Sequence, residues 1–136
     1  SGTPVMGHLG LTPQSIEKLG GHKVQGKSED SSKKILDEAA KLEDSGCFAL
    51  VLECIPDALA ARITANLTIP TIGIGAGPFT NGQVLVFQDL LGMQKDFKPK
   101  FLRHYISGEC IITEAINQFH KDVIQSDFPS IQESYR

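Results

Sequence analysis

The chain has 136 residues, of which 40% are hydrophobic and 21% charged, with a formal net charge of -3 at pH 7. This is the composition of a soluble globular protein, and it carries too little positive charge to follow the phosphate backbone of a nucleic acid. No apolar run reaches the roughly 18 residues of a membrane helix, no signal-peptide pattern occurs, and three cysteines without a C-x-x-C pair favour a reducing, cytoplasmic compartment.

The beginning of the chain predicts a short strand and a short helix. Residues 4–7 form an apolar segment expected to be a buried strand, and residues 7–10 (GHLG) are expected to leave it as a loop. Thr12 supplies a helix N-cap and Pro13 the first helical position, so a helix is predicted from there to the glycines at 20 and 21. The polar residues 21–30 are predicted to form a loop.

A longer helix and the strongest strand follow. Residues 31–45 are predicted to be helical, ending at Gly46, and their apolar side chains share one face: Ile35, Leu36, Ala39 and Leu42. Residues 48–53 (FALVLE) are an almost continuous apolar run, which is typical of a strand buried on both faces. Pro56 opens the next predicted helix, whose core face comprises Leu59, Ala60, Ile63 and Leu67.

The second half predicts two more strands and two more helices. The strands are expected at residues 69–74 and 84–87. One helix is predicted to begin at Pro99 and carry Phe101, Leu102 and Tyr105. The last covers residues 111–125, and its inward-facing side chains are expected to be Ile112, Ala115, Ile116, Phe119 and Val123.

Buried strands that alternate with amphipathic helices predict an α/β protein with a parallel sheet. Only about eight residues separate the last two strands, and a parallel crossover usually takes about a dozen, so their relative direction stays open. Four strands are too few for a closed α/β barrel, which needs eight. Either the sheet is small and doubly wound, or another chain completes it; the start at a strand without Met favours a fragment.

Glu53 is the main candidate for catalysis. A carboxylate at the end of an apolar strand is costly unless it has a partner or faces a site. Strand alternation places it on one face with Ala49 and Val51. Beside apolar walls, such a carboxylate can have a raised pKa and act as a base near neutral pH. The alternative is a partnered structural glutamate.

His8 is the second candidate, because it is expected just past the end of a strand. It either bonds to the backbone of its loop or donates to an anionic or carbonyl substrate. Its strand and that of Glu53 are successive, so one ligand is expected to reach both side chains.

The remaining candidates are weaker. The glycines in residues 73–77 (GIGAG) lack the spacing of a phosphate-binding turn and are expected to allow close backbone approach instead. Asp89 is a possible ligand for a hard cation, and Cys54 is interpreted as a small buried side chain rather than a nucleophile. The four histidines, at 8, 22, 104 and 120, show no metal-binding spacing.

Several segments, taken in order, resemble the ketopantoate hydroxymethyltransferase family. They are PVMGHLGLTPQS (residues 4–15), GGHKVQG (20–26), LVLECIP (50–56), IPTIGIGAG (69–77) and GQVLV (82–86). The resemblance implies the C-terminal half of a (β/α)8 TIM barrel of the phosphoenolpyruvate/pyruvate superfamily type. Residues 1–136 are then a single partial domain, with the last four strands and the C-terminal helices.

The resemblance also implies the chemistry. Glu53 occupies the position of the family's proton acceptor, where it is expected to remove the C3 proton or to hold the new hydroxyl group. His8 occupies the position of a histidine lining the keto-acid pocket. Mg²⁺ chelates 3-methyl-2-oxobutanoate through ligands in the missing N-terminal half, so no metal ligand is expected in this chain. The enolate then takes a one-carbon unit from 5,10-methylenetetrahydrofolate, giving 2-dehydropantoate for pantothenate biosynthesis. The expected partners are these small molecules, the N-terminal half, and further subunits of a homo-oligomer of decamer type.

Three hypotheses stay open on the sequence. The chain is part of an active hydroxymethyltransferase and inactive by itself, or it is a non-catalytic folded fragment. The third hypothesis is a related superfamily lyase that cleaves C–C bonds, against which the GHLGLTPQS and LVLECIP segments argue.

Overall fold

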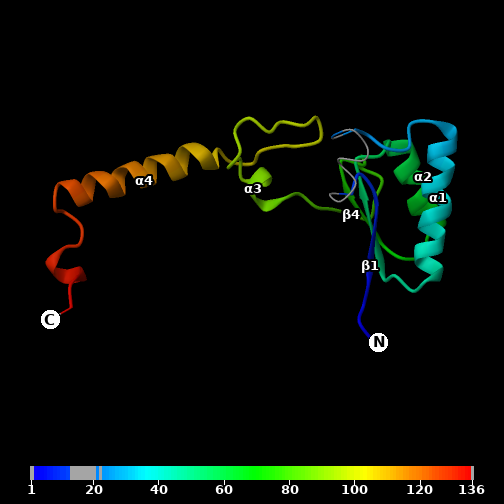
Figure 1. The fold of residues 1–136 in the computed structure, drawn as a ribbon, viewed down its shortest axis with the longest axis horizontal. Helices are drawn as coiled ribbons and strands as arrows, with labels where there is room; N and C mark the ends of the chain where they lie inside the picture. Colours follow the sequence, from blue (N-terminus) through cyan, green and yellow to red (C-terminus); the bar gives the residue numbers. More distant parts are fainter. Residues whose placement is uncertain (1, 13–20, 22, 136) are drawn as a thin grey trace. The chain divides into compact units, whose positions relative to one another are not determined.

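The computed structural model of the chain describes residues 2–12, 21 and 23–135 (Figure 1). The chain divides into two compact units, Ser1–Leu85 and Val86–Arg136. The first unit holds the sheet with its two long helices, and the second holds the C-terminal helix. The single partial domain expected from the sequence stays a prediction.

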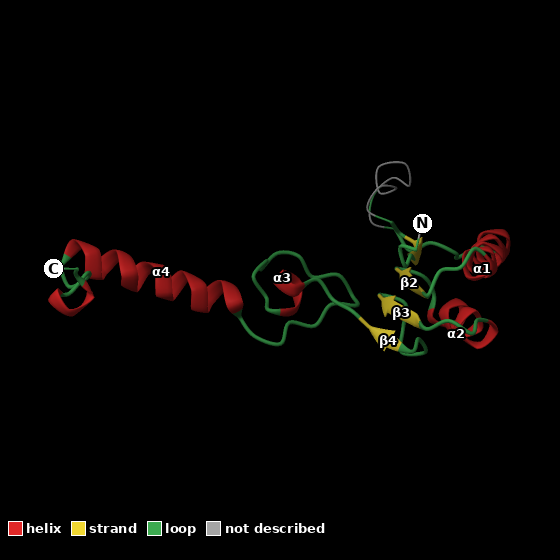
Figure 2. Cartoon of the chain, turned by 90° about the horizontal axis from the view of Figure 1, so that it is seen from below, coloured by secondary structure: helices red, strands yellow, loops and turns green. Residues whose placement is uncertain are grey.

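The first unit is built on a four-stranded sheet in which the strands lie in chain order and every pair is parallel. The strands are β1 Met6–Gly10, β2 Ala49–Glu53, β3 Thr71–Ile74 and β4 Gly82–Gln83. Helices α1 (Glu29–Asp44) and α2 (Asp57–Asn66) connect the first three strands and lie on the same side of the sheet (Figure 2). The predicted α/β fold with a parallel sheet is therefore confirmed.

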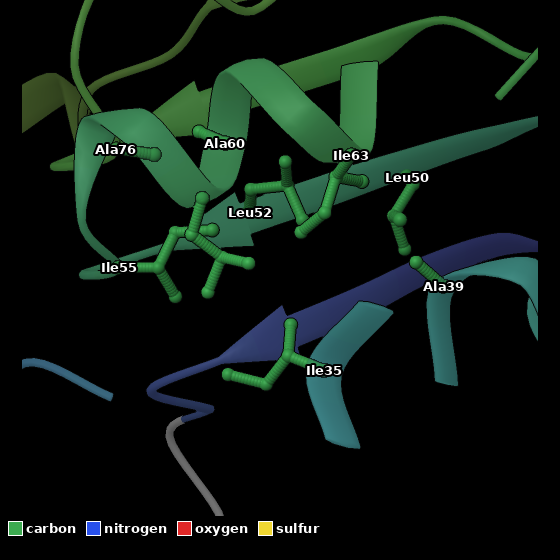
Figure 3. Close-up of a cluster of buried hydrophobic side chains, with 9 residues drawn as sticks. Ile35, Ala39, Leu50, Leu52, Ile55, Ala60, Ile63 and Ala76 are labelled. Atoms are coloured by element: carbon green, nitrogen blue, oxygen red, sulfur yellow. The ribbon is translucent and has the colours of Figure 1, made fainter. Parts of the chain in front are cut away.

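The hydrophobic core lies between β2 and these two helices (Figure 3). Leu50 and Leu52 have no exposed surface, and each such side chain contributes roughly 1.5–3 kcal/mol on burial. Around them pack the other buried residues of this core cluster, which are Ile35, Ala39, Ile55, Leu59, Ala60, Ile63 and Ala76. Strand alternation turns Val51 and Glu53 to the opposite face, which neither α1 nor α2 covers.

The predicted helix at residues 31–45 is confirmed as α1, although it begins two residues earlier. Ser28 is its N-cap and forms a capping box with Ser31, which satisfies backbone N–H groups of the first turn. Beyond the C-cap at Ser45, Gly46 has a φ of 91°, a left-handed conformation that ends the helix.

The first strand differs from its predicted bounds. It runs over Met6–Gly10, so the GHLG segment is part of the sheet and not a loop. The reason is its pairing, because Leu9 is opposite Leu52 and Gly10 is opposite Glu53. The helix predicted from Thr12 to residue 20 lies outside the described residues, except for Thr12.

The fourth strand was wrongly placed at residues 84–87, since pairing with β3 occurs at Gly82–Gln83. The pair is parallel in spite of its short connection. Gly75 and Gly77 turn the chain in left-handed conformations, and Asn81 accepts hydrogen bonds from the backbone N–H and the hydroxyl of Thr71. Val84 N–H still donates to Gly73 O in β3, and the chain then leaves the sheet, with Val84 and Val86 exposed.

The second unit contains helix α3 (Phe87–Leu90), helix α4 (Gly108–Ile124) and a short 3₁₀ turn, η2 (Ile131–Glu133). The helix predicted from Pro99 is wrong: the chain makes a single turn there, in which Leu102 N–H bonds to Pro99 O, and Tyr105 N–H then bonds to Leu90 O. The last predicted helix is confirmed as α4.

The apolar side chains of α4 were expected to face inward, and this is wrong for the described structure. Ile112, Ile116, Phe119 and Val123 are between 40% and 60% exposed. No other described element of the second unit packs over this face. Phe119 makes an aromatic contact with Phe128, with the ring centroids 5.4 Å apart. No helix in the described part of the chain is both long enough and apolar enough to cross a membrane.

Candidate active site

The two side chains singled out from the sequence meet at the carboxyl end of the sheet. His8 Nε2 lies 3.0 Å from Glu53 Oε2, within hydrogen-bond distance. The side chain of His8 is 34% exposed and that of Glu53 is 21% exposed, so both are reachable yet partly desolvated. The two residues come from successive strands that pair with each other, as expected, although His8 lies inside β1 rather than beyond its end. That one ligand reaches both side chains stays a prediction.

The strand register explains why these two side chains share a face. His8 is opposite Val51, and Gly10 is opposite Glu53, so His8 and Glu53 are diagonal neighbours on parallel strands. On the other side of Glu53, its register partner in β3 is Ile74. The carboxylate therefore has a glycine on one side, an apolar residue on the other, and His8 as a polar neighbour.

The backbone around Glu53 is held by three neighbouring segments. Leu11 N–H donates to Glu53 O, and Cys54 N–H donates to Ile74 O, each at 2.9 Å. Gln25 N–H donates to Cys54 O at the same distance. Cys54 has a φ of 49°, an uncommon left-handed conformation for a residue with a side chain, which turns the chain sharply after the strand.

Gly10 is a site residue that the sequence did not single out. Its φ of 96° favours glycine, and a Cβ at this position would collide with the carbonyl oxygen of Glu53. The sequence feature that could have identified it is a glycine at the end of a strand, because a glycine there permits close approach of a neighbouring backbone.

Cys54 does not have the surroundings of a reactive thiolate. Burial raises the pKa of its thiol, and the negative charge of Glu53 raises it further. Both effects disfavour the thiolate that a nucleophile needs. The sequence interpretation of Cys54 as a non-nucleophilic side chain agrees with this direction.

Gly73 and Gly77 lie close to neighbouring atoms and leave no room for a side chain. A Cβ on Gly73 would lie 2.6 Å from Thr80 Oγ1, and a Cβ on Gly77 would collide with Asp57 in the first turn of α2. These contacts support the expectation of close approach over that of a phosphate-binding turn.

Three other candidate residues belong to the second unit. Asp89 is buried in α3 of the second unit, His104 belongs to a non-helical segment there, and His120 is exposed on α4. His22 lies outside the described residues. His8 also lines a hollow of about 400 Å³ beside α1, together with residues that include Thr12, Gln25, Lys34 and Glu38.

The described residues do not offer a metal site of their own. Among them, no group of three or more His, Cys, Asp or Glu side chains converges as a metal ion requires. His8 and Glu53 are a pair bonded to each other, which leaves too few ligands for a hard cation such as Mg²⁺.

Comparison with known proteins decides the family. The family model described as "Ketopantoate hydroxymethyltransferase" matches residues 1–131. The chain belongs to the ketopantoate hydroxymethyltransferase family. The resemblance inferred from the sequence motifs is thereby confirmed.

Curated relatives within the family are similar over 135 residues, which is 99% of this chain. The 3-methyl-2-oxobutanoate hydroxymethyltransferase of Bdellovibrio bacteriovorus is 59% identical, and its namesakes from Francisella tularensis and Legionella pneumophila are 54% and 53% identical. The match covers 51% of the first two proteins and 52% of the third, so the chain spans about half the length of these relatives.

Proposed function

We propose that this chain forms the C-terminal half of a (β/α)8 barrel of the phosphoenolpyruvate/pyruvate superfamily type. Its four parallel strands in sequential order, with both long helices on one side, suit half of such a barrel. An N-terminal half of the same enzyme would supply the other strands and cover the face that carries Glu53. In this barrel, the carboxyl ends of the strands hold the active site.

The complete enzyme transfers a hydroxymethyl group from 5,10-methylenetetrahydrofolate to 3-methyl-2-oxobutanoate, giving 2-dehydropantoate. Family membership and the shared name of the curated relatives support this reaction. The observation in the structure that carries it is the carboxylate of Glu53, which ends a buried strand, faces away from the core and is partly desolvated.

Glu53 acts as the base of this reaction. Its carboxylate takes the proton from C3 of the keto acid, and the electron pair of the broken C–H bond forms the enolate. Water adds to the methylene carbon of 5,10-methylenetetrahydrofolate and tetrahydrofolate leaves, so the one-carbon unit becomes a formaldehyde equivalent that carries the oxygen of this water. C3 then bonds to that carbon, and its carbonyl oxygen takes up the proton held by Glu53 and becomes the new hydroxyl group. The apolar neighbour Ile74 and the partial burial of Glu53 favour proton transfer without competition from bulk water.

Other components come from outside the described residues. Mg²⁺, with ligands in the N-terminal half, supplies Lewis-acid stabilisation of the enolate when bound. His8 lies beside the base, with its Nε2 3.0 Å from Oε2 of Glu53. We further propose a cytoplasmic homo-oligomer, in keeping with what the family resemblance implies.

A hybrid enzyme tests this function. It consists of the part of the Bdellovibrio relative that this chain does not match, joined to this chain. The expected result is tetrahydrofolate-dependent formation of 2-dehydropantoate at a rate within about tenfold of the intact relative, while the 136-residue chain alone is inactive. A folded hybrid without transfer would contradict the proposal and favour a non-catalytic fragment. Cleavage of C–C bonds without a folate-dependent product would favour the lyase.

A further inference from the structure

We infer that His8 is a positioning residue for Glu53: its Nε2–H group donates to Oε2 of the carboxylate and thereby presents Oε1 to the carbon that loses its proton. This inference rests on the proposed function, because it assumes that Glu53 is the base. It differs from the role of a keto-acid ligand that the family resemblance implies for His8.

The contact is held at both ends by the sheet. His8 lies in the middle of β1, in register with Val51, so its backbone has little freedom. The backbone of Glu53 is held by the hydrogen bond from Leu11 N–H, while the next residue is bonded to Ile74. Both side chains therefore start from fixed backbone positions, and they make the 3.0 Å contact without help from a ligand.

The described neighbours of Glu53 in the sheet provide no substitute for His8. The residue opposite Glu53 in β1 is Gly10, which has no side chain, and its register partner in β3 is Ile74, which cannot donate a hydrogen bond. Among the residues that the structure describes, the hydrogen-bond partner of this carboxylate is His8. Loss of the imidazole therefore leaves the carboxylate free to rotate.

The hydrogen bond also indicates which nitrogen of His8 carries the proton and which oxygen of Glu53 is free to react. An ionised carboxylate only accepts, so His8 carries a proton on Nε2 and donates it to Oε2. Oε1 is the oxygen left to receive the proton from C3. A residue with this task alters the rate of proton removal, whereas a residue that binds the keto acid alters KM.

The matched pair His8→Gln and His8→Met tests the inference in the hybrid enzyme. Gln keeps an N–H donor at a similar reach, and Met has nearly the same volume without a donor. We expect His8→Met to lower kcat and the rate of deuterium exchange at C3 by about 10- to 100-fold, as for loss of a hydrogen bond to a charged group. KM for the keto acid is expected to stay within about twofold, and His8→Gln to recover most of the rate.

A double variant separates the outcomes. If His8 acts through Glu53, His8→Met adds little to the loss caused by Glu53→Gln, because the two groups work as a unit. An increase in KM at unchanged kcat, equal losses in the Gln and Met variants, or additive losses in the double variant would each overturn the positioning role while Glu53 remained the base. Absence of both exchange and transfer in the unmodified hybrid would instead overturn the proposed function, and this inference with it.

Discussion

Gly10 allows the backbone of Glu53 to come close to β1, because glycine has no side chain. Its φ is 96°, and an added Cβ would collide with the carbonyl oxygen of Glu53 and lie 2.9 Å from Ile55 Cγ2. We therefore expect Gly10→Ala to destabilise the chain by about 2–4 kcal/mol, from backbone strain and steric collision together. The change in free energy of unfolding is measured by urea denaturation.

Gly46 provides the matched control for this substitution. It has a similar φ of 91°, but an added Cβ would meet no atom within 4 Å. Gly46→Ala is thus expected to show the backbone cost alone, about 1 kcal/mol. Equal losses in the two variants would mean that the contact between Gly10 and Glu53 is unimportant.

Cys54 tests the electrostatics next to Glu53. Because burial and the Glu53 charge raise its pKa, less thiolate is present at neutral pH. We expect iodoacetamide to modify Cys54 about tenfold more slowly than the exposed Cys110, as followed by mass spectrometry. In Glu53→Gln the difference is expected to narrow without vanishing, since burial is the larger cause; faster modification of Cys54 than of Cys110 would contradict this account.

At the scale of the elements, Glu43 in the last turn of α1 secures the turn that leads into β3. Its Oε1 accepts hydrogen bonds from Thr68 N–H and Thr68 Oγ1 at 2.7 Å, and from Ile69 N–H at 3.0 Å. These bonds lower the pKa of Glu43 below its ordinary value of 4.5. Its stabilising contribution is therefore present above the ordinary pKa and is lost as the pH falls through the folded-state value.

Glu43→Gln is expected to be less stable than the wild-type chain at pH 7, and the difference is expected to shrink as the pH is lowered through the acid range. Urea midpoints measured from pH 7 to pH 3 follow this change. Glu38→Gln is the control on the same helix, because Glu38 forms an ion pair with Lys34 at the surface, 3.8 Å away, and such pairs contribute little to stability. A gap between Glu43→Gln and wild type that widened in acid would reverse the predicted sign.

The elements that local signals specify were predicted well, and those that depend on pairing were not. Helix α1 has a capping residue and a regular apolar face, and β2 is a continuous apolar run. The apolar residues Val84 and Val86 also suggested a strand, but pairing with β3 occurs at Gly82 and Gln83. Which residues a strand pairs with depends on the neighbouring strand, which the sequence of one segment does not contain.

At the scale of the whole molecule, α4 presents an apolar face that the described residues of its unit leave exposed. Ile116 is 60% exposed and Phe119 is 54% exposed. Exposed apolar patches of this kind bind hydrophobic dyes and promote association. We expect the isolated chain to enhance the fluorescence of such a dye, and Phe119→Ser to reduce the signal by about half.

Asn117→Ser is the control for this prediction, because Asn117 is an exposed polar residue on the same helix. It is expected to leave the dye signal unchanged, and both variants are expected to keep the urea midpoint of the first unit. An identical signal from Phe119→Ser and the wild-type chain would show that the dye binds elsewhere.

The candidate site was predictable in its members and not in its detail. Glu53 and His8 follow from the rule that parallel strands present their carboxyl ends at one edge. The register of β1 on β2 could not be predicted. This register makes the two side chains diagonal neighbours and places Gly10 opposite Glu53. The apolar face of α4 is a second example. Its sequence pattern predicts buried side chains, but it does not indicate which surface they would pack against.

Deuterium exchange at C3 of 3-methyl-2-oxobutanoate tests the role of Glu53 most directly, because it reports removal of the proton without the folate steps. In the hybrid enzyme, we expect Glu53→Gln to lower the exchange rate by about 100-fold or more, as for the loss of a general base. Exchange within a few-fold of the unmodified hybrid would contradict the assignment of Glu53 as the base.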